Sequence, residues 1–456
     1  MKTTPHPVAA RRRFLQGTAL GSAAMLSTTL ALPTFAQDAG ALSKLRLGFI
    51  GTGGRGNDNF SAMLGDAGVS VAALCDVDRV CLENAAKRAP DAAQFSDYRR
   101  LLAEVKDLDG VVISAPDHHH VYPAVTGLRQ GLHVYCEKPL VQSPWEARLI
   151  TQEAVKRPHL ATQMGTGGQA GADFMQTVAV VRSGALGDVK EVHISTDRPI
   201  WPQGEPLPEV IDTVPDSLDW DSWIGPRNDI PYIEKYREGR FRDQRVYHPF
   251  VWRGRWDFGT GALGDIAPHS MNVAFRALQL GAPTRVEAEA TSGMVGNAFP
   301  DWSVIRFDFP AIEGRAAVSI YWYDGKRSPP KEKTSGFELG VGGTVFIGTK
   351  GIWSGGIRPA PGQSENLYDG WKAPKQEEWP EQPFPEVHAD WLAGIREGRN
   401  PGCHFGYSGP MTEAYLLGNI SLRLGRPLDW DATKFTFNDA EADALLKHEY
   451  RDGWGV

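Results

Sequence analysis

The feature that most constrains this chain is a glycine-rich turn that directly follows a short apolar run. Residues 45–50 read Leu-Arg-Leu-Gly-Phe-Ile, as in a buried strand, and residues 51–56 read Gly-Thr-Gly-Gly-Arg-Gly, which fits G-x-G-x-x-G. In such a turn Gly51 makes the tight bend, Gly53 lets the backbone approach a pyrophosphate, and Gly56 lets helix and strand pack closely. The following helix presents free N–H groups to the phosphates. The residues expected to bind a dinucleotide here are Gly51, Thr52, Gly53, Gly54, Arg55 and Gly56.

The residues after this turn continue the pattern of a dinucleotide domain. A short helix is expected over residues 59–64, and a second strand over residues 69–74 leads to Asp76, which follows Gly56 by 20 residues. Asp76 would accept hydrogen bonds from the adenosine ribose hydroxyls, and its charge would repel a 2′-phosphate. We therefore expect the cofactor to be NAD. Arg55 could contact a phosphate, so NADP is the alternative cofactor. A glycine-rich loop of structural use only is the alternative to a cofactor site.

Helix and strand patterns alternate through the next part of the chain. Helices are expected over residues 98–105 and 122–128, and strands over residues 110–114 and 132–136. This alternation predicts an α/β fold with a doubly wound parallel sheet, whose ligand binds at the carboxyl ends of the strands. We assign residues 44–165 to this Rossmann-type domain.

Two of these strands end in polar residues, where the ligand would lie. One runs into Ser114-Ala-Pro-Asp-His-His-His120, and the next runs into Glu137-Lys138-Pro139. A lysine beside a bound nicotinamide could bond a substrate hydroxyl and tune proton transfer, whereas a solvated lysine paired with Glu137 is the alternative. Adjacent histidines point in different directions, so we expect no metal here. The cofactor-side residues expected at these ends are Ser114, Pro116, Asp117, His120, Glu137 and Lys138.

The second half of the chain changes pattern. Period-two alternation predicts strands over residues 190–196, 285–290, 302–309 and 315–323, with a hairpin-like pair over residues 337–341 and 344–347. Helical stretches cover residues 389–396 and 412–424. Because no βαβ alternation remains, residues 166–456 are expected to form an α+β domain with a large, mostly antiparallel sheet.

A long insertion, residues 201–256, interrupts this half and is rich in Pro, Trp, Tyr and Arg. Loops of this length inside a compact domain are usually functional or act as lids. Aromatic faces with Arg, Asp and His edges suit a carbohydrate site, and tryptophans that only fill gaps in the packing are an equal alternative.

An acid and a histidine stand four residues apart just beyond the insertion. Asp265 and His269 would share one face of a helix, and an acid that orients an imidazole gives a base poised near neutral pH. An ordinary helix contact is the alternative. Because proline is tolerated in the first helical turn, Pro268 predicts a helix that opens near Asp265.

Three motifs in combination resemble one enzyme family. The glycine turn at 51–56, the Ala-Pro-x-x-x-His step at 115–120 and Glu-Lys-Pro at 137–139 look like the glucose–fructose oxidoreductase, inositol dehydrogenase and MocA (Gfo/Idh/MocA) family, and the resemblance covers residues 44–456. It implies an NAD(P)-dependent oxidoreductase that acts on a sugar or polyol. It also implies an open sheet that covers the cofactor on one face and forms homo-oligomers through the other.

The same resemblance assigns roles to individual residues. Lys138 matches the catalytic lysine of the family, and Asp265 with His269 matches its Asp-x-x-x-His pair. His269 would take the hydroxyl proton, Asp265 would orient His269 and hold a neighbouring hydroxyl, and Lys138 would stabilise the alkoxide. His120 matches a histidine with a structural role on the cofactor side. Asp117 stands where many members have Asn.

The first 36 residues have the composition of an export signal. Arg11-Arg-Arg-Phe-Leu15 precedes a charge-free stretch rich in Ala, Ser and Thr that closes at Ala36. This run resembles a twin-arginine signal, which predicts cleavage near Ala36 and a periplasmic or otherwise exported protein without stable membrane insertion. An uncleaved membrane anchor is the alternative. Twin-arginine passengers fold before export, so NAD would be carried out and tightly held, and the chain's 4 cysteines are expected to be free.

Charge and motif together narrow the function. Lys and Arg number 48 against 55 Asp and Glu, a net charge of −7 that disfavours nucleic acid as a partner. We expect hydride transfer between a sugar or polyol carbon and a resident nicotinamide. An NAD-dependent glycoside hydrolase or lyase that oxidises its sugar transiently is the first alternative, and a non-catalytic sugar-binding protein is the second.

Overall fold

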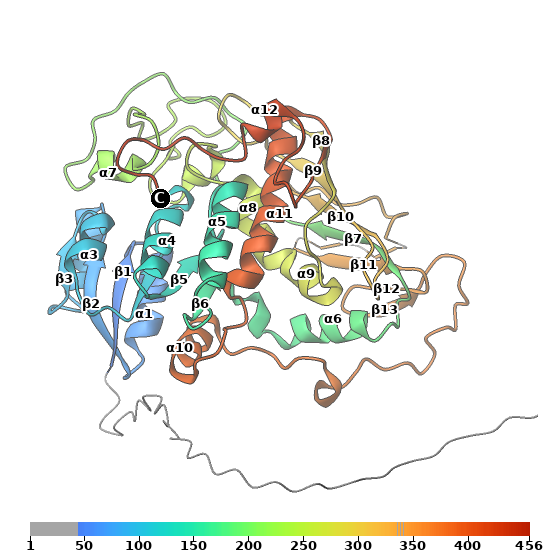
Figure 1. Cartoon of the computed structure of the whole chain (residues 1–456). Helices are drawn as coiled ribbons and strands as arrows, with labels where there is room; N and C mark the ends of the chain where they lie inside the picture. Colours follow the sequence, from blue (N-terminus) through green and yellow to red (C-terminus); the bar gives the residue numbers. More distant parts are fainter. Residues whose placement is uncertain (1–43, 335, 338, 341) are drawn as a thin grey trace, which may run out of the picture. The chain divides into compact units, whose positions relative to one another are not determined.

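A six-stranded parallel sheet forms the first layer of the computed structural model, which describes residues 44–456 except 335, 338 and 341 (Figure 1). The predicted export signal therefore lies outside the described residues. The strand order is β3-β2-β1-β4-β5-β6, as expected for a doubly wound sheet. The strands are β1 (Leu45–Ile50), β2 (Val69–Cys75), β3 (Ala93–Phe95), β4 (Gly110–Ile113), β5 (His133–Glu137) and β6 (Thr162–Gly165). The order reverses between β1 and β4, which is where such sheets bind ligands.

Helices connect these strands, and local sequence sets where several of them begin. They are α1 (Arg55–Leu64), α2 (Arg79–Ala86), α3 (Tyr98–Glu104), α4 (Val121–Arg129) and α5 (Pro144–Val155), with a short 3-10 turn, η1 (Asp117–His119), before α4. The side chains of Asp78 and Asp97 accept hydrogen bonds from the second amides of α2 and α3. Helix α5 begins with a capping box between Ser143 and Glu146, and Pro144 occupies its first turn.

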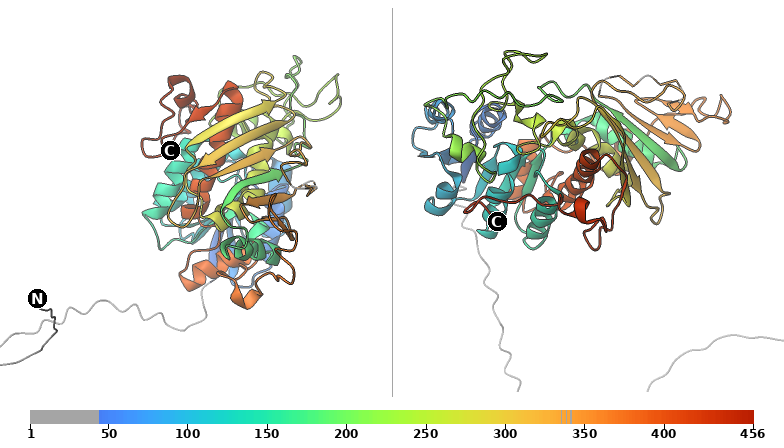
Figure 2. Two further views of the ribbon diagram at one scale, coloured as in Figure 1. Left: turned by 90° about the vertical axis from the view of Figure 1, so that its right-hand side faces the viewer. Right: turned by 90° about the horizontal axis from the view of Figure 1, so that it is seen from above.

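An eight-stranded sheet forms the second part of the fold, and its order is β13-β12-β11-β7-β10-β9-β8-β14. Only β7 and β10 pair in parallel among these strands, so the prediction of a mostly antiparallel sheet is confirmed. In the left view of Figure 2 one face of this sheet is turned to the viewer and the helices lie behind it. The strands are β7 (Val189–Ser195), β8 (Arg285–Thr291), β9 (Ser303–Phe309), β10 (Val318–Tyr323), β11 (Thr344–Gly348), β12 (Gly351–Trp353), β13 (Ile357–Pro359) and β14 (Leu428–Asp429).

The remaining helices pack between and beside the two sheets. They are α6 (Ala172–Arg182), α7 (Trp220–Ile224), α8 (Gly261–Ser270), α9 (Asn272–Leu278), α10 (Val387–Glu397), α11 (Phe405–Leu424) and α12 (Ala440–Asp443), with 3-10 turns η2 (Gly167–Ala170), η3 (Val251–Gly254) and η4 (Gln376–Glu378). Helix α11 packs on α5 and on α8, so it joins the two layers. Within the described part of the chain, no helix is both long and apolar enough to cross a membrane.

Two sequence predictions about this half are wrong. Strand β11 forms its hairpin with β12. The described residues of 337–341 lie in no strand, so the predicted hairpin across Gly342-Gly343 is absent among them. Helix α8 begins at Gly261 and not near Asp265, so Pro268 lies inside the helix. Thr260, a residue type common at N-caps, precedes the helix but makes no side-chain capping bond to it.

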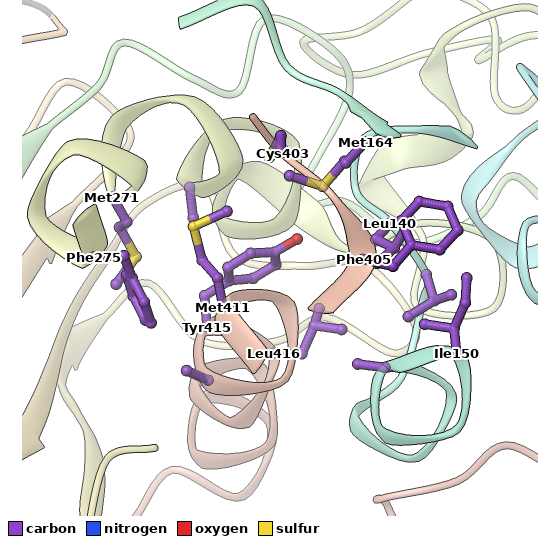
Figure 3. Packing of buried hydrophobic residues seen from close by; sticks show 14 of the residues in the cluster. Leu140, Ile150, Met164, Met271, Phe275, Cys403, Phe405, Met411, Tyr415 and Leu416 are labelled. Atoms are coloured by element: carbon purple, nitrogen blue, oxygen red, sulfur yellow. The ribbon is translucent and has the colours of Figure 1, made fainter. Parts of the chain in front are cut away.

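A continuous apolar core lies directly beneath the expected catalytic helix. Figure 3 shows Met271 and Phe275, which follow α8, packed near Met411 and Tyr415 of α11. Met164, at the end of β6, belongs to the same cluster. Side chains in such cores sit in fixed rotamers, so this packing holds the ends of β6 and α8 in one relative position.

Candidate active site

The glycine turn has the backbone geometry that a dinucleotide requires. Gly51 adopts a φ of +81°, which L side chains rarely adopt. A Cβ on Gly56 would lie 2.2 Å from the carbonyl oxygen of Gly51, so only glycine allows α1 to approach β1 this closely. Helix α1 has no side-chain cap, which leaves its N-terminal end for an anion. The turn therefore fits the pyrophosphate of NAD.

Asp76 lies at the end of β2, beside this turn. Its Oδ2 accepts hydrogen bonds from the amides of Thr52 and Gly53, at 2.7 and 3.2 Å, and its Oδ1 accepts one from the amide of Asp78 at 2.9 Å. Burial raises the pKa of Asp76, and the hydrogen bonds oppose that rise. The carboxylate of Asp76 thus holds the glycine turn in place.

Arg55 and Glu137 form an ion pair at the first helix of the domain. The Nε atom of Arg55 lies 3.1 Å from Oε1 of Glu137, and Nδ2 of Asn59 donates to the same oxygen at 3.0 Å. Asn59 also donates to Oγ of Ser114 at 2.9 Å. These contacts bring together the ends of β4 and β5 and the start of α1. Arg55 also lies 3.8 Å from the carboxylate of Asp58, so both of its ion pairs are with acidic side chains.

Lys138, Asp265 and an arginine from the insertion form one charged cluster. The Nζ atom of Lys138 lies 2.6 Å from Oδ1 of Asp265 and 3.0 Å from its backbone oxygen. Nε of Arg253 donates to the same Oδ1 at 3.1 Å. Burial would raise the pKa of Asp265, but the charges and hydrogen bonds of Lys138 and Arg253 hold it below its ordinary value. Asp265 is therefore ionised and holds two cations.

His269 is oriented by a threonine and not by the predicted acid. Thr166, directly after β6, donates its hydroxyl to the carbonyl oxygen of Pro268 at 3.1 Å and lies 2.8 Å from Nδ1 of His269. In the tautomer that matches a Thr166 hydroxyl donating to Pro268, Nδ1 is the donor and Nε2 is left as an acceptor. Burial first, and then the charge of Lys138, lowers the pKa of His269 to about 4. The prediction of a base near neutral pH, oriented by Asp265, is wrong because Asp265 is engaged by Lys138 and Arg253.

Asp117 and the histidines after it are buried at the end of β4. Asp117 accepts a hydrogen bond from the hydroxyl of Thr260 at 2.8 Å, and burial raises its pKa to about 7. His120 lies between the carbonyl oxygens of Ala115 and Pro139, at 2.7 and 2.8 Å from its ring nitrogens. Pro116 is the residue before the 3-10 turn η1. The ring of His120 thus links the loop after β4 to the loop after β5.

The insertion is joined to three of the strand-end loops. At the end of β2, the amide of Arg79 donates to the carbonyl oxygen of Ser217 at 2.8 Å. At the end of β4, the carbonyl oxygen of Trp223 lies 2.9 and 2.7 Å from the rings of His118 and His119. Figure 1 shows this segment, in yellow-green, running over one end of the parallel strands. After β5, the side-chain amide of Gln142 donates to the carbonyl oxygen of Trp256, the last residue of the insertion, and to that of Gly259 just beyond it.

The aromatic residues of the insertion mostly form a small core of their own. Trp220 and Trp223 stack with ring centroids 4.6 Å apart, and Tyr247 and Trp252 are buried in the same cluster. Phe250 is different, since it is 46% exposed. Most of these rings therefore stabilise the insertion, which is the second of the two alternatives raised by the sequence.

Sequence reasoning missed Arg253 and Thr166. Thr166 directly follows a parallel strand, so the rule that selected Asp117 and Lys138 would have found it. Arg253 is one of several arginines in the insertion, and no local pattern distinguishes it from the others.

Two family descriptions match the chain. Residues 45–165 match an oxidoreductase family with an NAD-binding Rossmann fold, and residues 172–317 match the C-terminal alpha/beta domain of that oxidoreductase family.

Curated relatives match over shorter stretches. Inositol 2-dehydrogenase of Salmonella typhimurium is 28% identical over 151 residues, which is 33% of this chain and 45% of the relative. A glycosyl hydrolase family 109 protein of Solibacter usitatus is 35% identical over 161 residues, or 32% of this chain and 35% of the relative. The chain thus spans less than half the length of these relatives.

Solved structures match over most of the chain. Aldose-aldose oxidoreductase of Caulobacter crescentus, complexed with glycerol, has a TM-score of 0.53 and 18% identity, over 85% of this chain and 100% of that one. GenD2 from gentamicin A biosynthesis, in complex with NAD, has a TM-score of 0.54 and 18% identity, over 86% and 97%. At these identities the likeness shows the fold.

Proposed function

The chain belongs to the Gfo/Idh/MocA oxidoreductase family and has its NAD-binding Rossmann domain, and from this premise we propose that it oxidises or reduces a hydroxyl carbon of a sugar or polyol with NAD. The observation that carries the proposal is the cluster in which Lys138 lies 2.6 Å from Asp265, at the carboxyl end of β5. His269 lies on the same helix as Asp265, four residues on. NAD, when bound, would accept the hydrogen and the electron pair from the substrate carbon.

The three residues would divide the proton chemistry. His269, neutral because its pKa is lowered to about 4, accepts the hydroxyl proton at Nε2 and passes it to solvent. The Nζ of Lys138 donates to the developing alkoxide, which lowers the cost of removing that proton. Asp265 holds Lys138 in place through its carboxylate and its backbone oxygen. In the reduction direction the same proton returns to the carbonyl oxygen.

The insertion supports a tightly bound cofactor. Contacts with the ends of β2 and β4 anchor it at the edge of the sheet where NAD would lie, through Ser217 and Trp223. His248 adds a contact at 3.3 Å between its Nε2 and Oδ2 of Asp78, next to the expected ribose side. A segment anchored at several points opens rarely, so it would slow cofactor release.

Export would make such retention necessary. We propose that residues 1–36 direct the folded, NAD-loaded chain through a twin-arginine pathway to the periplasm. Free NAD is scarce outside the cytoplasm, so a cofactor that dissociated after each cycle would not be replaced. The bound NAD would then be recycled in place, by a second sugar or another electron acceptor. Homo-oligomers through the open face of the eight-stranded sheet belong to the same proposal.

A second candidate is an NAD-dependent glycoside hydrolase. The similarity to glycosyl hydrolase family 109 proteins favours it, and the same Lys138, Asp265 and His269 would serve a transient oxidation of the sugar. In that chemistry the electrons return to the sugar, so no reduced cofactor accumulates.

The test is the near-ultraviolet absorbance of the purified exported protein before and after addition of sugars, polyols and glycosides. Bound NAD that becomes reduced with one sugar and is reoxidised by another supports the oxidoreductase. Cleavage of a glycoside without net reduction supports the hydrolase. Protein that contains no NAD and cannot be loaded with it contradicts both.

A further inference from the structure

The insertion contributes one cation, Arg253, to the candidate active site. Its Nε donates to Oδ1 of Asp265, the oxygen that Lys138 also holds, and its Nη1 donates to the carbonyl oxygen of Phe250 at 2.8 Å. A guanidinium has five N–H groups. No described residue accepts a hydrogen bond from Nη2 of Arg253. Nη2 is also not one of the fully buried donors without a partner, so it is accessible. Nη2 is therefore available to a ligand next to Lys138.

Two aromatic rings hold this guanidinium in place. Its Cζ lies 4.6 Å from the ring centroid of Phe250 and 4.3 Å from that of Trp252. Stacking of this kind fixes the plane of the guanidinium and leaves its edge free for hydrogen bonds. The available edge of Arg253 is therefore preorganised.

Phe250 itself has an unusual backbone. Its φ is +75°, a strained conformation for a bulky residue, and its side chain is 46% exposed although most aromatic residues of the insertion are buried. The rings of Phe250 and Trp201 are close to perpendicular, with their centroids 5.9 Å apart. The fold thus presents one aromatic ring to solvent beside Arg253, and an apolar sugar face could rest on it.

The charges of the site do not balance without a ligand. Lys138 and Arg253 carry two positive charges against the single negative charge of Asp265, and His269 is neutral because its pKa is lowered to about 4. Asp117 compensates only in part, since burial raises its pKa to about 7. One cation would suffice to stabilise an alkoxide, so a second one points to a further negative group.

We propose that Arg253 selects a substrate that carries a carboxylate, so that the sugar acted on is an acidic one such as a uronic or aldonic acid. Nη2 of Arg253 binds the carboxylate, the reacting hydroxyl lies against Lys138 and His269, and the apolar face of the substrate covers Phe250. This assignment rests on the proposed oxidoreductase function and names its substrate class.

The test compares matched acidic and neutral substrates on the NAD-loaded protein. The pairs are glucuronate with glucose, galacturonate with galactose and gluconate with glucitol, with glucose 6-phosphate as a different anion. We expect kcat/KM to be about 100-fold higher for the acid in at least one pair, as one charge-assisted contact allows. Binding is measured separately by calorimetry, which requires no turnover.

Variants then assign the preference to Arg253. Arg253→Met should lower kcat/KM for the acid about 100-fold, mainly through KM, and remove its preference over the neutral partner. Arg253→Lys, which keeps the charge without the planar fork, should recover part of this loss. Arg242→Met is the matched control, because Arg242 is another arginine of the insertion and its side chain is 73% exposed. Thermal unfolding of each variant shows whether the fold is retained.

The outcomes separate the two levels of the proposal. Equal kcat/KM for acid and neutral sugars overturns the substrate class and leaves the oxidoreductase standing. A stronger preference for glucose 6-phosphate overturns the assignment of a carboxylate as the group that Arg253 binds. If no compound reduces the bound NAD, the proposed function fails, and calorimetry then decides whether acids still bind through Arg253. Acid binding unchanged in a folded Arg253→Met variant overturns the inference.

Discussion

The two ends of the candidate site are built by different means. At the dinucleotide end the geometry is made by the backbone: Gly51 has a positive φ, and Gly56 approaches it more closely than any Cβ would allow. At the substrate end the geometry is made by charge, since Asp265 holds Lys138 and Arg253 through one oxygen. Backbone geometry tolerates no added atom, whereas a charged cluster can change its ligand with a single side chain.

This difference predicts which properties can be separated. NAD binding should depend on the turn and be insensitive to the charged cluster, while turnover should depend on the cluster even when NAD is fully bound. Four experiments test that separation, from the largest expected effect to the smallest.

Replacing Lys138 should abolish turnover without releasing NAD. In Lys138→Met the alkoxide loses its donor and Asp265 loses one of its two cations, so we expect turnover to fall by about 10³–10⁴-fold. The measurement is the rate of cofactor reduction with the best sugar, next to the NAD content of the purified protein. Lys156→Met, directly after α5, is the control, because that side chain is 62% exposed. Turnover close to that of the wild type would remove Lys138 from the chemistry.

Adding one methyl group to the turn should have the opposite result. In Gly56→Ala the new Cβ would meet the carbonyl oxygen of Gly51 at 2.2 Å, so α1 must move and the affinity for NAD should fall by roughly 10- to 100-fold. Gly281→Ala is the control, because no atom lies within 4 Å of its added Cβ. NAD binding by calorimetry and residual turnover at saturating NAD are both measured. A variant that binds NAD normally would show that the turn is only structural.

The same contrast explains what the sequence could predict. The turn at 51–56 and the strand ends at Asp76 and Lys138 are contiguous patterns, and a backbone motif of this kind is visible in one stretch of chain. A helix that carries Asp265 and His269 can be predicted from the sequence. The spacing of the two residues on that helix does not show which side chains they will bind.

The contacts of the site residues depend on tertiary packing. Asp265 binds Lys138 and Arg253 from two distant segments, and His269 binds Thr166, so their partners depend on how β6, α8 and the insertion are packed together. The tryptophans of the insertion had two equal interpretations, because burial of an aromatic ring is not a property of its local sequence. The neighbours of each tryptophan in the folded protein, and not its residue type, distinguish a sugar-binding ring from a packing ring.

Acid should weaken the substrate end through His269. The pKa of His269 is about 4 in the folded protein and about 6.5 when unfolded, so the unfolded chain binds more protons between these values. Stability is therefore full above pH 6.5 and is lost as the pH falls toward 4. His269 should contribute roughly 1–2 kcal/mol of this loss at pH 5.

Urea unfolding at pH 7 and at pH 5 tests this for wild type and His269→Gln. The variant should lose less free energy of unfolding between the two pH values, by that amount. His118 and His119, whose pKa values burial also lowers, act in both proteins and cancel in the comparison. An equal loss in the two proteins would mean that His269 is protonated as easily in the folded state as in the unfolded one.

The smallest effect is expected where the insertion meets the dinucleotide end. Nε2 of His248 lies 3.3 Å from Oδ2 of Asp78, a partly exposed contact worth at most about 1 kcal/mol. His248→Ala should therefore leave the unfolding free energy nearly unchanged and increase the rate of NAD release several-fold, since other contacts such as that between Arg79 and Ser217 remain. Exchange of bound NAD for a fluorescent analogue measures that rate, and Arg242→Ala controls for changes elsewhere in the insertion. A rate of NAD release equal to that of the wild type would show that the contact between His248 and Asp78 does not help to retain the cofactor.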